Sequence, residues 1–320
     1  MNLAIIGCGV IGQRHLESVL NLDNKVKIFL IDKSNICLSK CKQISLKKKR
    51  LKSFYFAKSV SEIEEDFDFV IVATNSDHRF SVLKELYRHK TPKFIILEKF
   101  LFNKLVHFNE AKKLFQLHGT KVWVNQWMST DFPDLSNIFN ETDEINISVK
   151  GKNWNFCSNC VHYIDWFHHI NNRKKITLSN SILESVIIEN KRKGFFETFG
   201  SFEFHGINNN KLLLQCSYEK NSERNTLISL SSKSSKAEFQ LTVDSLKGFI
   251  IRSNQKKSID FKFKHLSERT SIYIESILEK NQCALPTYDQ SMFHHKLIFQ
   301  TLKRHFDKSY LKTSNLLPIT

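Results

Sequence analysis

The chain has 320 residues, enough for two domains at roughly 100–200 residues each, and its 41% apolar and 25% charged residues are those of a folded protein. Seven scattered cysteines form no disulfide framework, and no stretch approaches the ~20 apolar residues of a membrane helix. These features exclude a small disulfide-stapled scaffold. They favour a soluble protein of the cytoplasm with no membrane insertion.

The net charge of +16 raises the question of an anionic partner. The densest basic run is Lys47-Lys48-Lys49-Arg50, which has no interleaved aromatics and no DNA-binding motif beside it. A solvated loop accounts for this run better than a specific nucleic-acid site does. A nucleotide-bearing or phosphorylated small molecule would suit the charge equally well.

Residues 1 to about 125 alternate short apolar runs with helix-patterned stretches, as βαβ units do. The expected strands are Leu3–Ile6, Val26–Ile31, Phe54–Phe56, Phe69–Ala73, Phe94–Leu97 and Val122–Val124. Because most are short and continuously apolar, we expect helices on both faces of a parallel sheet. The pattern predicts a doubly wound α/β Rossmann domain over residues 1–123.

Beyond residue 140 the apolar residues follow a period near two. The expected strands include Ile145–Val149, Phe202–Phe204, Phe239–Val243 and Phe261–Phe263, with helices at about 159–171, 267–280 and 289–306 and a hairpin loop at Ser231–Lys236. We predict an α+β domain over residues 124–320, with an open, largely antiparallel sheet and C-terminal helices that pack back on the first domain. One wet face of that sheet would suit a homodimer or homotetramer.

The segment Gly7-Cys-Gly9-Val-Ile-Gly12 is a G-x-G-x-x-G fingerprint between an expected strand and an expected helix. Gly7 permits a tight turn, Gly9 lets backbone amides approach a pyrophosphate, and Gly12 lets the helix pack closely on the strand. Val10 and Ile11 begin that helix, beside the phosphates. The fingerprint predicts a dinucleotide site.

Asp32 follows Gly12 by 20 residues, at the end of the second expected strand. A carboxylate there can accept a hydrogen bond from a ribose hydroxyl and repels a 2′-phosphate, so NAD is favoured over NADP. Lys33 next to it softens that preference. A Walker A loop would need Gly-Lys-Ser or Gly-Lys-Thr, which the segment lacks.

Cys157 and Cys160 form a lone C-x-x-C pair, with no second pair at zinc-site spacing. Neither flank has the pattern of a thioredoxin βαβ unit. We therefore expect no metal here.

On these residues the chain resembles the Gfo/Idh/MocA oxidoreductase family over nearly its whole length. Ile6 to His15 is similar to the family's first motif, and Asp68 to His78 is similar to its fourth strand and following loop. The resemblance implies that Thr74, Asn75 and His78 lie along the cofactor. The family usually has Pro where this chain has Asn75.

Glu98-Lys99-Phe100 is similar to the family's Glu-Lys-Pro motif, with Phe100 in place of Pro. The resemblance makes Glu98 a cofactor contact and places Lys99 near the nicotinamide and the substrate hydroxyl, as a catalytic, cofactor-binding and substrate-binding residue. The chemistry agrees, because a lysine at the carboxyl end of a parallel strand can hold or move a proton at the ligand crevice.

The stretch from Asn153 to Trp166 is similar to the family's second-domain helix with its His-x-x-Asp pair. His162 and Asp165, three residues apart on one helix face, are the expected proton carrier and the carboxylate that orients it. Ser158 stands where many relatives have an Asp. We expect Ser158, Asn159 and His162 to contact the substrate.

A branch of the family found with cell-surface polysaccharide synthesis is resembled by the sequence around Asn159 and by the segments Val124–Trp127, Leu285–Tyr288 and Pro318–Thr320. Trp127 is a further expected substrate contact, and an Arg pair common beside it in that branch is missing. We predict an NAD(P)-dependent oxidoreductase of surface polysaccharide synthesis that moves a hydride to or from a secondary alcohol or ketone of a sugar, sugar acid or sugar nucleotide. The alternatives are a non-catalytic NAD(H)-binding sensor and an NAD-dependent glycosidase without net redox turnover.

Overall fold

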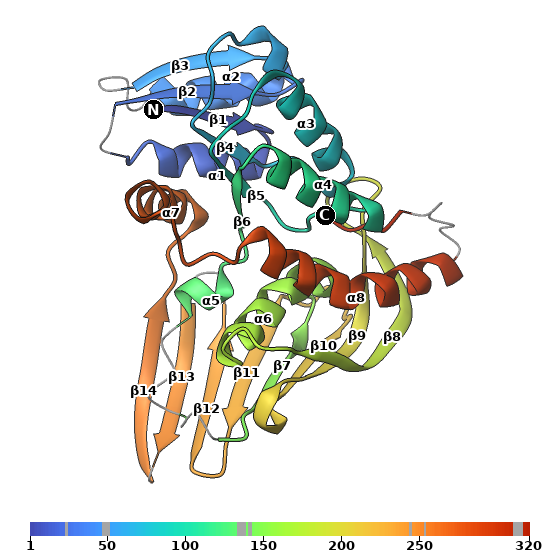
Figure 1. Ribbon diagram of the computed structural model, residues 1–320. Coiled ribbons are helices and arrows are strands. Elements are labelled where there is room, and N and C mark those ends of the chain that lie inside the picture. Colours follow the sequence, from blue (N-terminus) through green and yellow to red (C-terminus); the bar gives the residue numbers. More distant parts are fainter. Residues whose placement is uncertain are drawn as a thin grey trace. The chain divides into compact units, whose positions relative to one another are not determined.

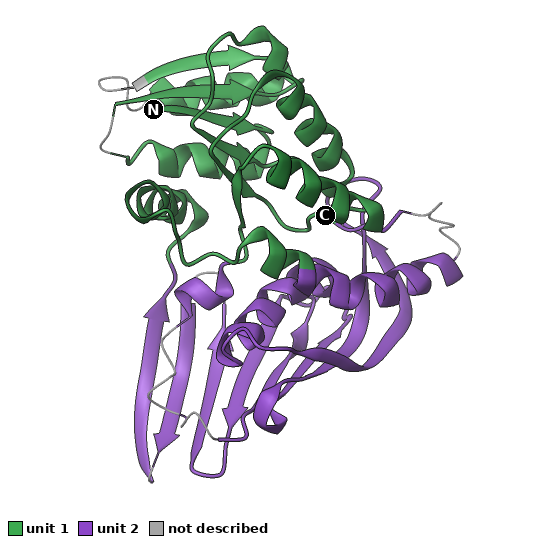
Figure 2. Cartoon of the chain, in the orientation of Figure 1, with its two compact units in different colours: residues 1–126, 264–292, 320 green, residues 127–263, 293–319 purple. Residues whose placement is uncertain are grey.

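The computed structural model describes residues 1–22, 25–46, 52–132, 139, 143–242, 245–252, 254–309 and 316–320. The chain divides into two compact units (Figure 2): unit 1 holds residues 1–126, 264–292 and 320, and unit 2 holds residues 127–263 and 293–319. The sequence-based expectation placed one boundary at residues 123/124. The basic run Lys47–Arg50 and the end of the expected strand at Val243 lie outside the described residues.

Unit 1 is built on a six-stranded sheet in which every pairing is parallel, with strand order β3-β2-β1-β4-β5-β6 (Figure 1). Its elements are β1 (Asn2–Ile6), α1 (Val10–Val19), β2 (Val26–Ile31), α2 (Asn35–Ser45), β3 (Lys52–Ala57), β4 (Phe69–Val72), α3 (Ser76–His89), β5 (Phe94–Leu97), α4 (Leu105–Leu117), β6 (Lys121–Val124) and α7 (Leu266–Lys280). The six expected strands are confirmed, each to within two residues at either end.

The central strands of unit 1 are buried on both faces of the sheet, whereas the edge strand β3 is largely exposed. All four residues of β4 are buried, and Leu3 and Ile5 of β1 are completely inaccessible. Helix α7 adds Ile274 and Ile277 to the same core cluster as Leu16 of α1. The carboxyl ends of β1 and β4, where the strand order reverses, are the usual ligand position of such a sheet.

Unit 2 contains an eight-stranded sheet in the order β14-β13-β12-β11-β7-β10-β9-β8. Its elements are α5 (Met128–Asp131), β7 (Asn146–Lys152), α6 (Phe156–Ile170), β8 (Thr177–Glu189), β9 (Phe196–His205), β10 (Lys211–Ser217), β11 (Asn225–Ser231), β12 (Ser235–Leu241), β13 (Ser245–Arg252), β14 (Gln255–Lys262) and most of α8 (Tyr288–Lys308). All pairings are antiparallel except that of β7 with β10. The expected α+β class and the hairpin between β11 and β12 are confirmed.

Alternating residues of the central strands of unit 2 form its core. Leu212 and Leu214 of β10 face Phe204 and Phe202 of β9, and all four are fully buried. Helix α6 packs on β9 and β10, across one face of the sheet (Figure 1). The outer strand β8 is mostly exposed along its length. Among the described residues, no helix has the length and apolar character needed to span a bilayer.

Candidate functional site

The glycine turn after β1 has the geometry that the fingerprint predicts. Gly7 has φ of +97°, and a Cβ there would lie 2.9 Å from the backbone of Ala73 and Thr74. A Cβ on Gly12 would lie 1.9 Å from the carbonyl oxygen of Gly7, so α1 can approach the turn only with glycine at this position. At Gly9 nothing lies within 4 Å of the added Cβ. The turn is therefore closed on the protein side and open at Gly9.

The carboxylate of Asp32 is fixed beside this turn by backbone amides. The N–H of Cys8 donates to Oδ2 at 2.6 Å, and the N–H of Ser34 donates to Oδ1 at 2.8 Å. The residue is half-buried and lines the cavity described below. Asp32 thus presents an oriented pair of acceptors at the end of β2.

A cavity of about 400 Å³ lies at the carboxyl ends of the strands of unit 1. Of the residues predicted to contact a cofactor, it is lined by Gly7, Gly9, Asp32, Thr74, Asn75 and His78. Lys33, Lys58 and Ser59 line it as well, and Lys58 and Ser59 were not predicted. Val10 and Ile11 occupy the first turn of α1, where Val10 is largely exposed.

The lining of the cavity suits the polar groups of a dinucleotide. The open space at Gly9 lies at the amino end of α1, where no side chain caps the helix and no acidic residue stands in the first turn. Such an end attracts phosphate through its amides and dipole. Asp32 places two oriented acceptor oxygens at the edge of the same cavity.

Glu98, at the end of β5, is buried in a polar network of unit 1. Its Oε1 lies 2.9 Å from Nε2 of His15 and accepts a hydrogen bond from the amide of Asn125, while Nδ1 of His15 lies 2.8 Å from Oγ1 of Thr270. Burial acts to raise the pKa of Glu98, but the bond and charge of His15, with smaller contributions from Asn125 and Arg79, bring it below its ordinary value. These contacts join β5, α1, β6 and α7.

Lys99 follows Glu98 and is half-buried, and the peptide bond between Lys99 and Phe100 is cis. Phe100, at the position of the family's Pro, is fully buried. The turn is also held by Arg79 of α3, which bonds to the carbonyl oxygens of Phe100 and Leu101. Sequence reasoning missed this residue, since Arg79 reads there as one more charge of an exposed helix.

In unit 2, His162 lies on α6 and is almost fully buried. Its ring lies 5.8 Å from that of Trp127, which in turn contacts Phe263 edge-on at 5.2 Å. The structure thus brings together two of the residues predicted to bind substrate. Ser158 and Asn159 lie one turn earlier on α6, with Asn159 donating to the carbonyl of Trp154 at 2.8 Å.

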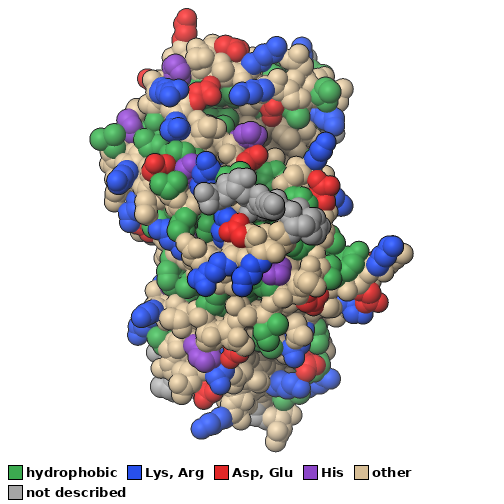
Figure 3. All heavy atoms as spheres, turned by 90° about the vertical axis from the view of Figure 1, so that its right-hand side faces the viewer, with side chains coloured by type: hydrophobic (Ala, Val, Ile, Leu, Met, Phe, Trp, Pro, Cys, Tyr) green, Lys and Arg blue, Asp and Glu red, His purple; other side chains and the backbone are tan. Residues whose placement is uncertain are grey.

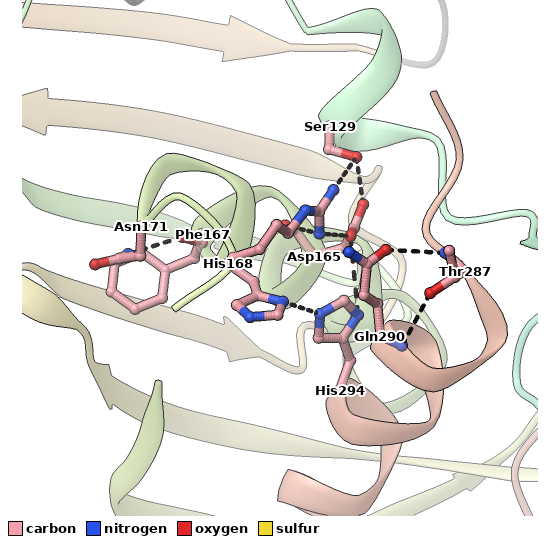
Figure 4. Close-up of polar contacts among 9 residues, drawn as sticks. Ser129, Asp165, Phe167, His168, Asn171, Thr287, Gln290 and His294 are labelled. Carbon is pink, nitrogen blue, oxygen red and sulfur yellow. Dashed lines mark hydrogen bonds and ion pairs between the residues drawn. The ribbon is translucent and has the colours of Figure 1, made fainter. Parts of the chain in front are cut away.

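Asp165 has partners other than the one expected. Its completely buried carboxylate accepts from Oγ of Ser129, forms an ion pair with Arg173, and lies 3.8 Å from Nδ1 of His294 (Figure 4). Burial raises the pKa of Asp165, against the opposing effects of Arg173 and Ser129. The carboxylate therefore connects α5 with the segment after α6, and its role in orienting the imidazole of His162 stays a prediction.

The two buried histidines next to Asp165 share a hydrogen bond of 2.8 Å, from Nδ1 of His168 to Nε2 of His294 or the reverse (Figure 4). Burial, followed by the charge of Arg173, lowers the pKa of His168 to about 4. Burial also lowers the pKa of His294, with the charges of His168 and Arg173 acting in the same direction. Both rings are therefore neutral at pH 7, and the positive charge of the cluster resides on Arg173.

The C-x-x-C pair lies in the first two turns of α6. The N–H of Cys157 donates to the buried carboxylate of Glu197 at 2.7 Å, and the thiol of Cys160 donates to the carbonyl of Cys157 at 3.2 Å. Burial and the charge of Glu197 raise the pKa of Cys157. Within the described residues, no group of His, Cys, Asp or Glu side chains is placed to hold a metal ion.

Lys and Arg side chains are spread over the face drawn in Figure 3, among acidic and uncharged ones, with no single large basic patch on it. Among the residues that line the cavity, Lys33 and Lys58 carry positive charge, and Asp32 and Glu85 carry negative charge. The local charge at the cavity is thus mixed.

The sheet order, the glycine turn and the acidic residue after β2 define unit 1 as a Rossmann domain of the dinucleotide-binding class. Residues 1–126 match the model of the Gfo/Idh/MocA family, described as an oxidoreductase family with an NAD-binding Rossmann fold. This is the family whose motifs the sequence resembles. No curated protein matches the sequence.

Solved structures with the same two-domain fold cover nearly the whole chain. One is the UDP-N-acetylglucosamine 3-dehydrogenase GnnA from Acidithiobacillus ferrooxidans (11% identity, TM-score 0.68, 94% of this chain and 96% of that chain). A second is KijD10, a 3-ketoreductase from Actinomadura kijaniata (12%, 0.69, 95% and 97%). A third is the transcriptional regulator Gal80p from Kluyveromyces lactis (14%, 0.70, 99% and 93%). At these identities the likeness establishes the fold.

Proposed function

We propose that the chain is an NAD(P)-dependent oxidoreductase of the Gfo/Idh/MocA family, acting on a secondary alcohol or ketone of a sugar, sugar acid or sugar nucleotide. The observation that carries this proposal is the cavity at the glycine turn, with Asp32 held by two backbone amides at its edge. A bound nicotinamide dinucleotide supplies or accepts the hydride. Residues of the chain bind, orient and exchange the proton.

In unit 1, the amides at Gly9 and the amino end of α1 would hold the pyrophosphate, and Asp32 would accept from the ribose. Thr74, Asn75 and His78 line the same cavity and would contact the cofactor along its length. Glu98 bonds to His15 and Asn125 and directly precedes Lys99 in the chain. It would therefore act on the site indirectly, by fixing the start of the turn that carries Lys99.

Lys99 and His162 are the groups we assign to the proton. Lys99 would polarise the substrate oxygen with its ammonium, and His162 would accept or return the proton of that oxygen. Asp165, through Ser129 on α5, would hold the segment that carries Trp127 beside His162. Trp127, Ser158 and Asn159 would bind the sugar.

For the cofactor we propose NAD, because an ionised Asp32 disfavours a 2′-phosphate. Lys33 and Lys58 in the cavity favour the opposite choice. Structures with this fold include a complex with NAD⁺ and a complex with NADP.

The names of the similar structures, a dehydrogenase of a UDP-sugar and a 3-ketoreductase crystallised with TDP-benzene, support a sugar nucleotide as the substrate class. A role in surface polysaccharide synthesis, a cytoplasmic location and a homo-oligomeric state are part of the same proposal and rest on the sequence. Each of the three can be tested separately from the activity.

The proposal is tested by absorbance of NADH at 340 nm, with a panel of 3-keto and 4-keto nucleotide sugars and their alcohols. We expect turnover by the wild-type protein, and a loss of 10²-fold or more in kcat for Lys99→Met and for His162→Gln, since each removes a positioned proton donor or acceptor. Calorimetry should show NAD⁺ binding to both variants. Equal turnover in wild type and Lys99→Met would refute the assignment.

A second candidate function is a non-catalytic NAD(H) sensor. Ser158 in place of an acid, together with the likeness to the regulator Gal80p, favours it. Binding of NAD(H) to the wild-type protein, with no turnover on any substrate of the panel and none restored by Ser158→Asp, would support the sensor. Measured turnover would remove it.

A further inference from the structure

Arg79, in the first turn of α3, is a charged side chain with an exposed fraction of only 1%. Its Nη1 donates to the carbonyl oxygens of Phe100 and Leu101, the latter at 2.8 Å, and its Nη2 donates to the carbonyl oxygen of Thr74. One guanidinium therefore bonds to the backbone of two separate loops. Its planar fork of donors makes this possible, whereas a lysine ammonium acts as a point charge.

The two loops are the ones that matter for the candidate site. Thr74 follows β4 and lines the dinucleotide cavity. Phe100 and Leu101 come directly after Lys99, at the end of β5. The side chain that joins them comes from α3, which itself begins right after the Thr74 loop.

Burial of a guanidinium carries a large desolvation cost unless hydrogen bonds and an opposite charge compensate it. The three carbonyls supply the hydrogen bonds. The opposite charge comes from Glu98, whose pKa the positive charge of Arg79 helps to lower. Glu98 precedes Lys99 in the chain, so Arg79 holds the turn from its far side while Glu98 anchors its near side to His15.

Because Phe100 stands at the position of the family's Pro, the turn lacks the backbone restraint that a proline would supply. A proline at that position, as the family resemblance implies, would fix φ near −65°. Phenylalanine does not fix φ. The fully buried ring of Phe100 restrains its side chain but not the carbonyl groups of the turn. The guanidinium of Arg79 restrains the carbonyls of the same turn.

We propose that Arg79 is a positioning residue for Lys99: it ties the backbone at Thr74, which the cofactor would contact, to the turn that carries Lys99, so that cofactor binding orders the lysine. This inference rests on the proposed function for the role of Lys99. In this proposal, Arg79 itself touches neither the cofactor nor the substrate.

The test compares Arg79→Met, which keeps the length but has no donors, with Arg79→Lys, which keeps the charge. Arg88→Met is the matched control, because Arg88 is an exposed arginine of the same helix. Backbone hydrogen exchange is measured by mass spectrometry with and without NAD⁺, on peptides covering residues 7–13 and 98–104. In wild type and Arg88→Met, NAD⁺ should slow exchange in both peptides.

In Arg79→Met, NAD⁺ should still protect residues 7–13, while residues 98–104 exchange about tenfold faster than in wild type and gain no protection from NAD⁺. Arg79→Lys should fall between the two. With a substrate from the panel, kcat of Arg79→Met should fall on the order of 10²-fold with KM changed less than threefold, because misplacement of Lys99 affects the reacting geometry more than binding.

Unchanged protection of residues 98–104 in Arg79→Met, or equal losses in kcat and in thermal stability for Arg79→Met and Arg79→Lys, would overturn the inference while leaving the proposed function intact. If Arg79→Met does not fold, the same comparison is made between Arg79→Lys and Arg88→Met. A wild-type protein without NAD⁺ binding, in which neither peptide is protected, would overturn both proposals.

Discussion

Alanine at the two helix-side glycines of the fingerprint should affect different properties, stability at Gly12 and NAD⁺ binding at Gly9. In Gly12→Ala the new methyl would begin 1.9 Å from the carbonyl oxygen of Gly7 and must move to about 3.4 Å, so α1 and the turn must separate by about 1.5 Å. The obstacle is backbone and cannot rotate away. In Gly9→Ala the methyl meets nothing within 4 Å, and φ of −64° suits any residue.

Overpacking of this kind costs about 3 kcal/mol at the upper end of its range, and alanine returns ~1 kcal/mol through its higher helix propensity. We therefore expect Gly12→Ala to lose about 2 kcal/mol, or roughly 4–8 °C in Tm for a unit of this size. Gly9→Ala should lose less than ~1 kcal/mol, the difference between Gly and Ala at an N-cap.

Thermal unfolding followed by circular dichroism measures the loss of stability in Gly12→Ala. Calorimetric titration measures the affinity of Gly9→Ala for NAD⁺. Gly9→Ala should bind NAD⁺ at least ~10-fold more weakly, a loss of about 1.4 kcal/mol, because its methyl occupies the space where the pyrophosphate would approach. A wild-type Tm for Gly12→Ala, or wild-type NAD⁺ affinity for Gly9→Ala, would refute this reasoning.

Three further predictions concern the charged groups. Asp32→Asn replaces an acceptor oxygen by an amide group that faces a backbone N–H. NAD⁺ affinity should therefore fall at least ~10-fold, and the ratio of NADP⁺ to NAD⁺ affinity should rise. Calorimetric titration with both cofactors measures this ratio, and an unchanged ratio would count against Asp32 as the ribose acceptor. The unfolded chain protonates His168 near pH 6.5 and the folded chain only near 4, so the free energy of unfolding should fall by up to ~3 kcal/mol as the pH drops from 6.5 to 4. Urea unfolding should show a weaker dependence of this free energy on pH in His168→Gln. The same pH dependence in both proteins would be inconsistent with a buried neutral ring. Asp165→Asn leaves Arg173 without its carboxylate and should cost about 3 kcal/mol in urea unfolding, against ~1 kcal/mol for Ser129→Ala; equal costs would mean that the ion pair contributes little.

The parts of the fold that local sequence determines were predictable. The parallel strands are continuous apolar runs, and the glycine fingerprint lies in one contiguous segment with Asp32 at a fixed offset, so both can be located without knowing the tertiary structure. Strand β8 was missed because it is exposed on most residues and shows no alternation of apolar and polar side chains. Strands β10 and β13 were not named either, although β10 alternates, whereas β11 was expected only through the hairpin that follows it.

The partners of the site residues were harder to predict, because they come from distant parts of the chain. Glu98 bonds to His15, 83 positions away, and His15 reaches Thr270 of α7, 255 positions away. Asp165 was paired with His162 through the family resemblance and the helix spacing, and neither indicated that Arg173 reaches back over the end of α6 to form an ion pair with the same carboxylate. An arginine shortly after a helix that holds a buried acid is the signal that could have indicated this pair.

The amides that hold Asp32 also determine how much of its carboxylate remains for a ligand. A carboxylate has about four lone-pair directions, and Cys8 and Ser34 occupy one on each oxygen. One free direction per oxygen is left, which matches the two adjacent hydroxyls of a ribose. Asp32 would then recognise a vicinal diol as a unit, and a 2′-deoxyribose would form half of the contact.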